Sequence, residues 1–372
     1  MTNTKWLSAL LAGTALTVAS TAAMADTSLV TMTRNAAGEG VTFSIAPTAD
    51  MPASATEITV GGRVRAEVYS ESGDETDMDE FLYNEGTGIR ADWALYISGK
   101  TDTSVGQVRA FVNMYGNGAG NTTSGSDATA NVTSVSSAGE WDFAPGLTLI
   151  GGNTTTLDGG TMGFGADIGS WLGRYGTIAT GDHANEVVGV RYSSGPMSVT
   201  AGVANDKDDD NGENFDVTGQ VMFDMGVGTV GASFIRGEEA SGTDTGYSAS
   251  IGATIAAGDQ LSFSGVYTMS DGRTDYYTIK STGSFYDEGD CDEVDDECSA
   301  ISLGATYATG DFKFSAGYAI QSDDNEDTAS EIRGSVAWSA TPKLSIVGQI
   351  VNKSDEDDGD TNVAGVGAWF KF

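Results

Sequence analysis

The stretch GVGAWFKF, residues 365–372, ends the chain in an alternating pattern. Read with a period of two, one face of this stretch carries Val366, Ala368, Phe370 and Phe372, and the other carries Gly365, Gly367, Trp369 and Lys371. Such alternation predicts a β-strand with one apolar face. A strand at the end of a chain stays ordered only when a neighbour pairs with it, so the stretch predicts a sheet that holds its own last strand.

The N-terminal residues predict export from the cytoplasm. Lys5 precedes an apolar run rich in small residues, and Ala23-Met24-Ala25 forms a small-x-small cleavage site before Asp26. Residues 1–25 are therefore expected to be a signal peptide. The rest of the sequence contains no run of eighteen apolar residues, which excludes a transmembrane helix there. The mature chain is then either soluble or crosses a membrane as strands.

The charge of the chain is strongly acidic and unevenly distributed. Its 53 acidic and 18 basic residues give a formal net charge of −35, which excludes a nucleic-acid partner. At 39% hydrophobic residues the chain has enough apolar side chains to build a sheet. The acidic residues gather in five stretches, which we expect to be loops: 73–80, 205–214, 286–298, 321–328 and 353–361.

Segments of strand length with alternating polarity lie between the acidic stretches. In residues 58–69, Val64 and Val68 share one face, while Arg63 and Arg65 share the other. Similar patterns predict strands near residues 88–98, 106–115, 186–193, 197–204, 216–224, 228–236, 247–255, 260–269, 275–281, 300–308, 312–320, 331–339 and 343–351.

Short turns alternate with the acidic stretches along the chain. The turns are poor in charge and lie at 193–196, 225–228, 256–259, 309–311 and 340–343. This alternation is typical of an up-and-down antiparallel sheet, and in a transmembrane barrel of short periplasmic turns and long extracellular loops. With roughly ten residues for each strand, four for each turn and fifteen for each loop, sixteen strands need about 310 residues. The mature chain has 372 − 25 = 347 residues, so sixteen strands fit.

We therefore predict an all-β transmembrane barrel over residues 57–372, most simply with sixteen strands and a water-filled lumen. Its last strand must pair with the first, because a barrel leaves no free edge. Eighteen strands stay open as an alternative, since the strand boundaries between 117 and 186 are not defined by the pattern. Residues 26–56 form an N-terminal extension that is either a periplasmic lead, an extra element or a plug.

The sequence resembles the general porins of alphaproteobacterial outer membranes. The resemblance rests on the signal peptide, the opening strand ITVGGRVRAEV (58–68), the pair WLGRYGTIATGD (171–182), the pair VVGVRYSSGPMSVTAGVAND (187–206) and the Phe-terminated GVGAWFKF. It implies a homotrimer in the outer membrane that passes ions and small hydrophilic solutes. It also implies that the barrel-assembly machinery reads Phe372 as an assembly signal.

The resemblance further implies that the third loop folds into the barrel and narrows it. That loop lies within 154–186, where Asp158 and Asp167 are the acidic candidates. The strand pattern independently supplies basic residues for the opposite wall, because a charge that faces lipid costs about 2–4 kcal/mol at the membrane midplane. These pore-lining candidates are Arg63, Arg65, Arg90, Arg109 and Arg191. The alternative is that some of them simply pair with acidic neighbours near the rims.

The two cysteines and the acidic loops suggest further features. Cys291 and Cys298 lie seven residues apart in an exported chain, which favours a disulfide over a metal site. The acidic loops are also candidates for binding calcium ions, which would bridge lipopolysaccharide or neighbouring loops. The alternative is that these loops are simply solvated. Its candidate ligands are Asp206, Asp208, Asp210, Asp355, Asp357 and Asp360.

Other functions fit the sequence less well. An enzyme is not expected: His183 is the only histidine, and the G-x-G-x-x-G match at 226–231 lies between strand patterns with no helix. An exported calcium-binding adhesin would explain the acidic loops but requires separate units without closure. A solute-specific channel is the nearest alternative. The preferred interpretation is a diffusion channel that favours cations, because acidic loops concentrate them at its mouth.

Overall fold

A computed structural model describes residues 30–34, 41–45, 56–73, 86–118, 130–154, 178–180, 185–205, 215–238, 245–271, 279–281, 297–322, 328–355 and 359–372. All elements in these ranges are β-strands. No helix among them has the length and apolarity needed to cross a membrane.

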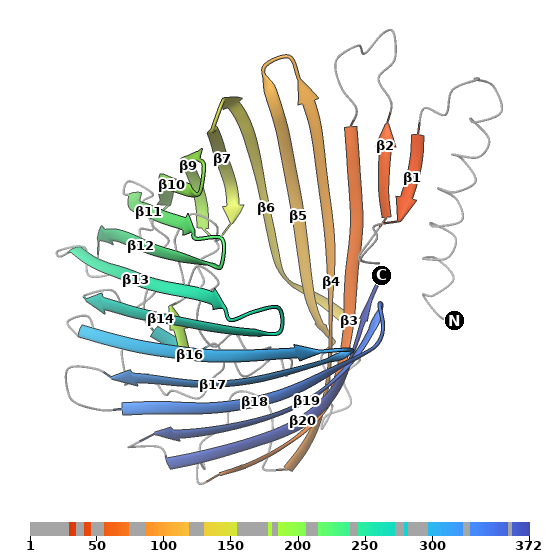
Figure 1. Cartoon of the computed structure of the whole chain (residues 1–372), viewed down its shortest axis with the longest axis vertical. Helices are drawn as coiled ribbons and strands as arrows, with labels where there is room; N and C mark the ends of the chain where they lie inside the picture. The colour runs from red at the N-terminus through yellow and green to blue at the C-terminus, as the bar shows by residue number, and fades with distance from the viewer. Residues whose placement is uncertain are drawn as a thin grey trace.

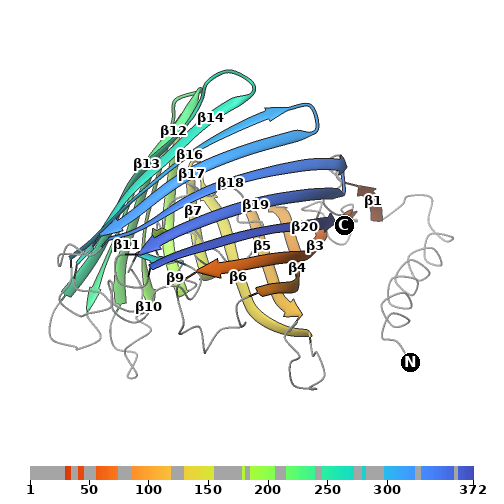
Figure 2. The same cartoon turned by 90° about the horizontal axis from the view of Figure 1, so that it is seen from below.

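Sixteen antiparallel strands form one closed wall (Figures 1 and 2), as the sequence predicts. In order round the wall they are β3 (Thr56–Gly73), β4 (Gly86–Thr103), β5 (Gly106–Gly118), β6 (Ala130–Ala144), β7 (Leu147–Thr154), β9 (Asn185–Ser194), β10 (Met197–Asn205), β11 (Phe215–Asp224), β12 (Gly228–Glu238), β13 (Thr245–Ala256), β14 (Leu261–Asp271), β16 (Glu297–Thr309), β17 (Phe312–Ser322), β18 (Thr328–Thr341), β19 (Leu344–Asp355) and β20 (Gly359–Lys371).

The wall closes where β20 pairs with β3. The register runs from Thr361 opposite Gly73 to Lys371 opposite Arg63. Beyond it, the Phe372 N–H donates to the Gly62 carbonyl (3.0 Å) and the Gly62 N–H donates to the Phe372 carbonyl (3.1 Å). The C-terminal stretch is therefore paired to its last residue, which is the closure that its alternating pattern predicts.

The two ends of the barrel differ as the sequence indicates. The tight turns predicted at 193–196, 225–228, 256–259, 309–311 and 340–343 all join neighbouring wall strands. Hydrogen bonds between successive turns place them on one rim: Asp224 N–H donates to the Pro196 carbonyl and Ser339 N–H to the Asp311 carbonyl, both at 2.8 Å. The connections at the other end contain the acidic stretches, most of which lie outside the described residues.

The G-x-G-x-x-G match is part of one of these turns. Gly226 has a φ of 80°, a conformation that favours glycine, and its N–H donates to Asp224 Oδ1 at 2.7 Å. The stretch joins β11 to β12.

Some strand predictions were wrong. Residues 275–281 were expected to be a wall strand, but the described part, β15 (Ile279–Ser281), lies outside the wall. It pairs instead with β8 (Ile178–Thr180), the described part of the strand pair expected at 171–182. The pattern also missed β6 and β7, although the Pro145-Gly146 turn between them was a recognisable signal.

Part of the N-terminal extension forms a hairpin beside the closure. Strands β1 (Val30–Arg34) and β2 (Val41–Ile45) pair with each other, and β2 pairs with the first residues of β3, from Val41 opposite Val60 to Ile45 opposite Thr56. The hairpin thus uses the same edge of β3 as β20 does, further along the strand (Figure 1). Val30–Arg34 and Val41–Ile45 thus add two short strands to the sheet.

The barrel has its polar side chains inside and its apolar side chains outside. In β3, Val64 and Val68 are 44% and 43% exposed, whereas Arg65 and Glu67 are 7% and 3% exposed. The same outward apolar side chains recur round the wall, among them Ile89, Val108, Leu149, Val190, Val203, Val221, Phe234, Ile251, Ile301, Leu303, Val336, Ile350 and Val366. This inversion matches a wall that faces hydrocarbon outside and water inside.

Exposed aromatic rings gather near the rim of the tight turns. They are Trp141, Phe143, Tyr192, Phe223, Phe263, Tyr307, Phe312, Phe314, Trp338, Phe370 and Phe372. Neighbouring rings of this row stack across strands, as Phe312 and Trp338 do with centroids 6.4 Å apart. Aromatic rows of this kind mark the membrane–water interface of transmembrane barrels.

The closure predicts a sensitive glycine. A Cβ on Gly62 would lie 2.4 Å from the Phe372 ring and 2.6 Å from the Ala94 carbonyl oxygen. The carbonyl oxygen belongs to the paired backbone of the wall and cannot move away to make room. We expect Gly62→Ala to destabilise the folded barrel by about 1–3 kcal/mol through overpacking. Urea unfolding of the barrel in lipid vesicles, followed by tryptophan fluorescence, measures this.

The matched control is Gly99→Ala, where the nearest atom to the new Cβ is 3.8 Å away. Equal stability of the two variants would contradict the packing of Phe372 on Gly62.

Candidate functional site: the charged inner wall

The inner wall of the barrel carries predicted arginines on strands β3, β5 and β9. The register aligns β3 with β4 so that Arg65 lies opposite Asp92, and β5 with β6 so that Arg109 lies opposite Glu140. On β9, Arg191 lies opposite Thr148 of β7. Because successive residues of a strand alternate between faces, these positions all face the lumen.

Arg65 forms a buried ion pair with Asp92. The Arg65 Nε–H donates to Asp92 Oδ2 at 2.8 Å, and Nη2 contacts the same oxygen. The two side chains are only 9% and 8% exposed. A buried carboxylate beside a guanidinium neutralises its charge locally, so Arg65 contributes little net field to the lumen.

Arg109 and Arg191 belong to a larger cluster. Arg109 Nη2 lies 2.7 Å from Asp142 Oδ1, its Nε lies 3.2 Å from Glu140 Oε2, and Arg191 Nη2 lies 2.6 Å from Glu140 Oε1. The Thr148 hydroxyl donates to Asp142 Oδ1 at 2.6 Å. Two guanidinium groups and two carboxylates thus alternate across β5, β6 and β9 with no net formal charge.

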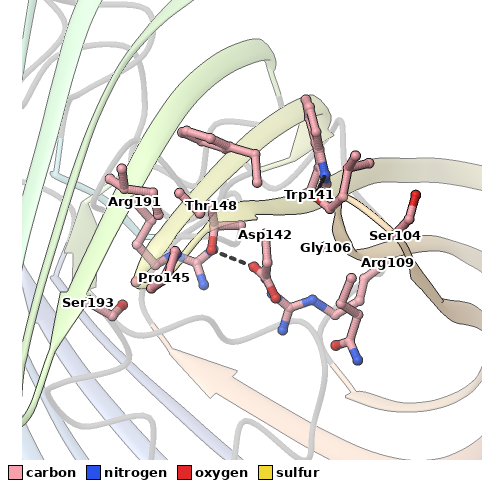
Figure 3. A pocket seen from close by; sticks show the side chains of 15 residues that line it. Ser104, Gly106, Arg109, Trp141, Asp142, Pro145, Thr148, Arg191 and Ser193 are labelled. Atoms are coloured by element: carbon pink, nitrogen blue, oxygen red, sulfur yellow. Dashed lines mark hydrogen bonds and ion pairs between the residues drawn. The ribbon is translucent and has the colours of Figure 1, made fainter.

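Except for Glu140, the residues of this cluster line a hollow of about 930 Å³ near the rim of the tight turns (Figure 3). Figure 3 shows Arg109 and Arg191 on either side of Asp142 and Thr148. The turn between β4 and β5 forms one border, where Trp141 Nε1–H donates to the Val105 carbonyl at 3.0 Å. The two arginine side chains are partly exposed, Arg109 at 38% and Arg191 at 30%.

Further basic side chains lie at the closure and on the nearby strand β18. The guanidinium carbon of Arg63 lies 4.9 Å from the centre of the Trp369 ring, and Lys371 Nζ lies 5.8 Å from it. Both distances fit cation–π contacts. On β18, Arg333 Nη2 donates to Glu331 Oε2 at 2.7 Å, with both side chains almost fully buried.

The predicted site residues therefore have different outcomes. Arg65, Arg109 and Arg191 are paired with acidic neighbours, the arrangement that the sequence analysis kept as an alternative, whereas Arg63 contacts Trp369. Arg90 lies opposite Glu67 in the register, but its side chain is outside the described residues. Asp158 and Asp167 are also outside them.

The loop features stay largely predictions. Cys298 is 4% exposed at the start of β16, and no described cysteine is free, but Cys291 lies outside the described residues. Of the calcium candidates, Asp206, Asp208, Asp210 and Asp357 lie outside them too, and Asp355 and Asp360 belong to β19 and β20. The described residues contain no group of three or more possible metal ligands. The disulfide and calcium binding stay predictions.

Sequence reasoning missed the acidic partners of the arginines. Glu140 and Asp142 lie on β6, which the pattern did not identify, and Asp92 lies in the strand predicted near 88–98 but was not identified as a partner of an arginine. The alternation of Glu140 and Asp142 with Trp141 and Phe143 was the signal that could have revealed them.

The buried pair predicts a large effect of removing its acid. We expect Asp92→Ala to destabilise the folded barrel by about 3 kcal/mol, because Arg65 then keeps a charge without its carboxylate. Thermal unfolding of the purified barrel in detergent measures the change.

Glu57→Ala is the matched control, since its pair with Lys100 has side chains 38% and 51% exposed. Exposed pairs contribute less than about 1 kcal/mol. An equal loss of thermal stability in both variants would show that burial does not make the Arg65–Asp92 pair more important for stability than an exposed pair.

Comparisons with known proteins agree with this geometry. A family model described as "Gram-negative porin" matches residues 12–372. No curated protein matches the sequence. Among solved structures, the outer-membrane channel DcaP of Acinetobacter baumannii superposes with a TM-score of 0.61 at 14% identity, over 85% of this chain and 97% of that one. A mutant of the Rhodobacter blastica porin superposes with a TM-score of 0.54 at 17% identity, over 85% of this chain and all of that one.

These matches confirm the resemblance to bacterial porins and the fold that it implied. The described wall strands form one closed ring, not the separate units that the adhesin alternative requires. Trimers and signal peptides are typical of the matched family. The chain belongs to the Gram-negative porin family, and its family and fold are those of an outer-membrane channel rather than an enzyme.

Proposed function

We propose that the protein is a trimeric, water-filled diffusion channel for ions and small hydrophilic solutes, with a mild preference for cations. The observation that carries the proposal is the closed ring of sixteen strands with polar side chains inside and apolar side chains outside. A ring of this size is too wide for side chains to fill, so water occupies the space that loops leave open.

The inner wall favours general diffusion. Its described arginines are mostly paired: Arg65 with Asp92, Arg109 and Arg191 with Glu140, and Arg333 with Glu331. Paired charges give short-range polarity without a strong net field. Such a wall hydrates small polar solutes and disfavours apolar ones without selecting one compound.

Cation preference follows from the charge that the wall does not balance. The chain carries a net charge of −35, and its acidic stretches belong mainly to the connections opposite the tight turns. A mouth surrounded by carboxylates raises the local concentration of cations and lowers that of anions. The effect decreases as salt screens the loops.

The conductance of single channels tests the pore itself. We expect purified protein in a planar bilayer to give conductance steps in groups of three that rise in proportion to bulk salt, as an aqueous trimer requires. Measurement at two potassium chloride concentrations is sufficient. Folded protein that inserts but gives no steps would contradict a diffusion channel, and single steps would contradict the trimer.

The reversal potential in a salt gradient tests selectivity. We expect potassium to be about twice as permeant as chloride at low salt, and the ratio to fall when Asp206, Asp208, Asp209 and Asp210 are changed to Asn. Asn205→Ser, Asn211→Ser and Asn214→Ser together form the matched control, because they alter the same stretch without a charge change. An anion preference of the parent protein would show that the wall arginines, rather than the loops, control the field.

A further inference from the structure

Four charged side chains near the rim of the tight turns form an open chain of ion pairs. Their order is Arg191, Glu140, Arg109 and Asp142, with nitrogen–oxygen distances of 2.6, 3.2 and 2.7 Å between successive members. Each of the two middle members contacts an opposite charge on both sides. Among the described residues, each end member contacts an opposite charge on one side only. The chain of ion pairs therefore ends in a cation on one side and in an anion on the other.

Both end members keep groups that can bind a further partner. Arg191 contacts Glu140 through Nη2, which leaves the donors on its Nε and Nη1. Asp142 accepts from the Arg109 guanidinium and from the Thr148 hydroxyl at the same atom, Oδ1, which leaves Oδ2. A carboxylate of a solute can bind the first end and an ammonium group can bind the second, both through charge-assisted hydrogen bonds.

The two ends share one hollow, whereas the middle acid does not line it. Arg191, Asp142 and Thr148 all line the hollow of about 930 Å³, and Figure 3 shows Asp142 and Thr148 between the two arginines. The side chains of Arg191 and Asp142 are 30% and 35% exposed, against 18% for Glu140. The hollow is thus lined by the two members of the chain that have an unmatched side.

The strand register sets the spacing between the two ends. Asp142 of β6 lies opposite Thr148 of β7, which in turn lies opposite Arg191 of β9. Neighbouring strands are about 4.8 Å apart, so the backbones at the two ends are roughly 10 Å apart. An extended dipeptide is at most about 7 Å long, which leaves room for the charged side chains on either side of it.

We propose that this hollow is a binding subsite for small zwitterions such as dipeptides, with the solute carboxylate on Arg191 and the solute ammonium group on Asp142. The bound solute closes the open chain of ion pairs into a ring. Two guanidinium groups and two carboxylates have no net formal charge, so a zwitterion keeps the site neutral, whereas an anion or a cation adds an unbalanced charge. The inference rests on the proposed function, because a subsite on the inner wall serves permeation only in a lumen that conducts.

Calorimetric titration of the folded protein with three small probes tests the charge pattern. Glycylglycine carries both charges, N-acetylglycine carries only the carboxylate, and glycinamide carries only the ammonium group. We expect glycylglycine to bind at least roughly fivefold more tightly than either of the others, since only it makes both charged contacts. Equal binding of either singly charged probe would overturn the zwitterion assignment. Absence of glycylglycine binding would overturn the subsite itself.

Variants of the two ends test which residues hold the solute. We expect Arg191→Gln and Asp142→Asn each to weaken glycylglycine binding roughly tenfold, because each removes one charge-assisted contact. Lys313→Gln is the matched control: it removes an exposed basic side chain beside the turn between β16 and β17, outside the hollow. Unchanged binding in either end variant, or an equal loss in the control, contradicts the assignment.

A charge-preserving variant and conductance keep the test independent of folding. Arg191→Lys retains the charge beside Glu140, so we expect it to weaken binding less than Arg191→Gln does; the reverse order is evidence against the subsite. Single-channel steps in a planar bilayer establish that each variant is folded. A parent that conducts but does not bind glycylglycine overturns the subsite alone. A parent that gives no steps contradicts the proposed function instead, so the two failures are distinguishable.

Discussion

Pairing of every backbone group is the constraint on which this structure depends. Hydrocarbon offers no partner to an N–H or C=O group, so a sheet that crosses it must have no free edge. The chain satisfies this with one seam, β20 against β3, which joins residues roughly three hundred positions apart. The seam needs room as well as hydrogen bonds, and Gly62 provides the space in which the Phe372 ring lies.

The polar inner face of the wall contains charged side chains, and most of these charges are balanced locally. Water in the lumen permits charged side chains, yet most of the described arginines have a carboxylate beside them. Local neutrality keeps long side chains folded against the wall and limits their pull on passing ions. The acidic excess of the chain is concentrated in the sequence stretches that connect the wall strands opposite the tight turns.

Much of the barrel could be predicted from the sequence. In a strand with one apolar face, apolar and polar side chains alternate with a period of two residues, and tight turns contain characteristic residues such as glycine. The terminal strand, the seam and the turn at Gly226 are examples. The short segment at 279–281 shows where such prediction fails. Its polarity alternates as in a wall strand, but the strand with which it pairs depends on contacts that the local sequence does not encode. The ion pairs show another: Arg65 and Asp92 are 27 residues apart, and only the cross-strand register makes them partners.

The hairpin of β1 and β2 has a consequence for alignment of the seam. A sheet can slip by two residues and keep every side chain on its proper face, so polarity alone does not choose between such registers. Strand β2 occupies the edge of β3 up to Val60, and Phe372 ends opposite Gly62, so only Gly61 separates the two strands that share this edge. A shift of β20 by two residues in that direction would bring it onto β2. The hairpin therefore acts as a physical stop that defines where the last strand must end.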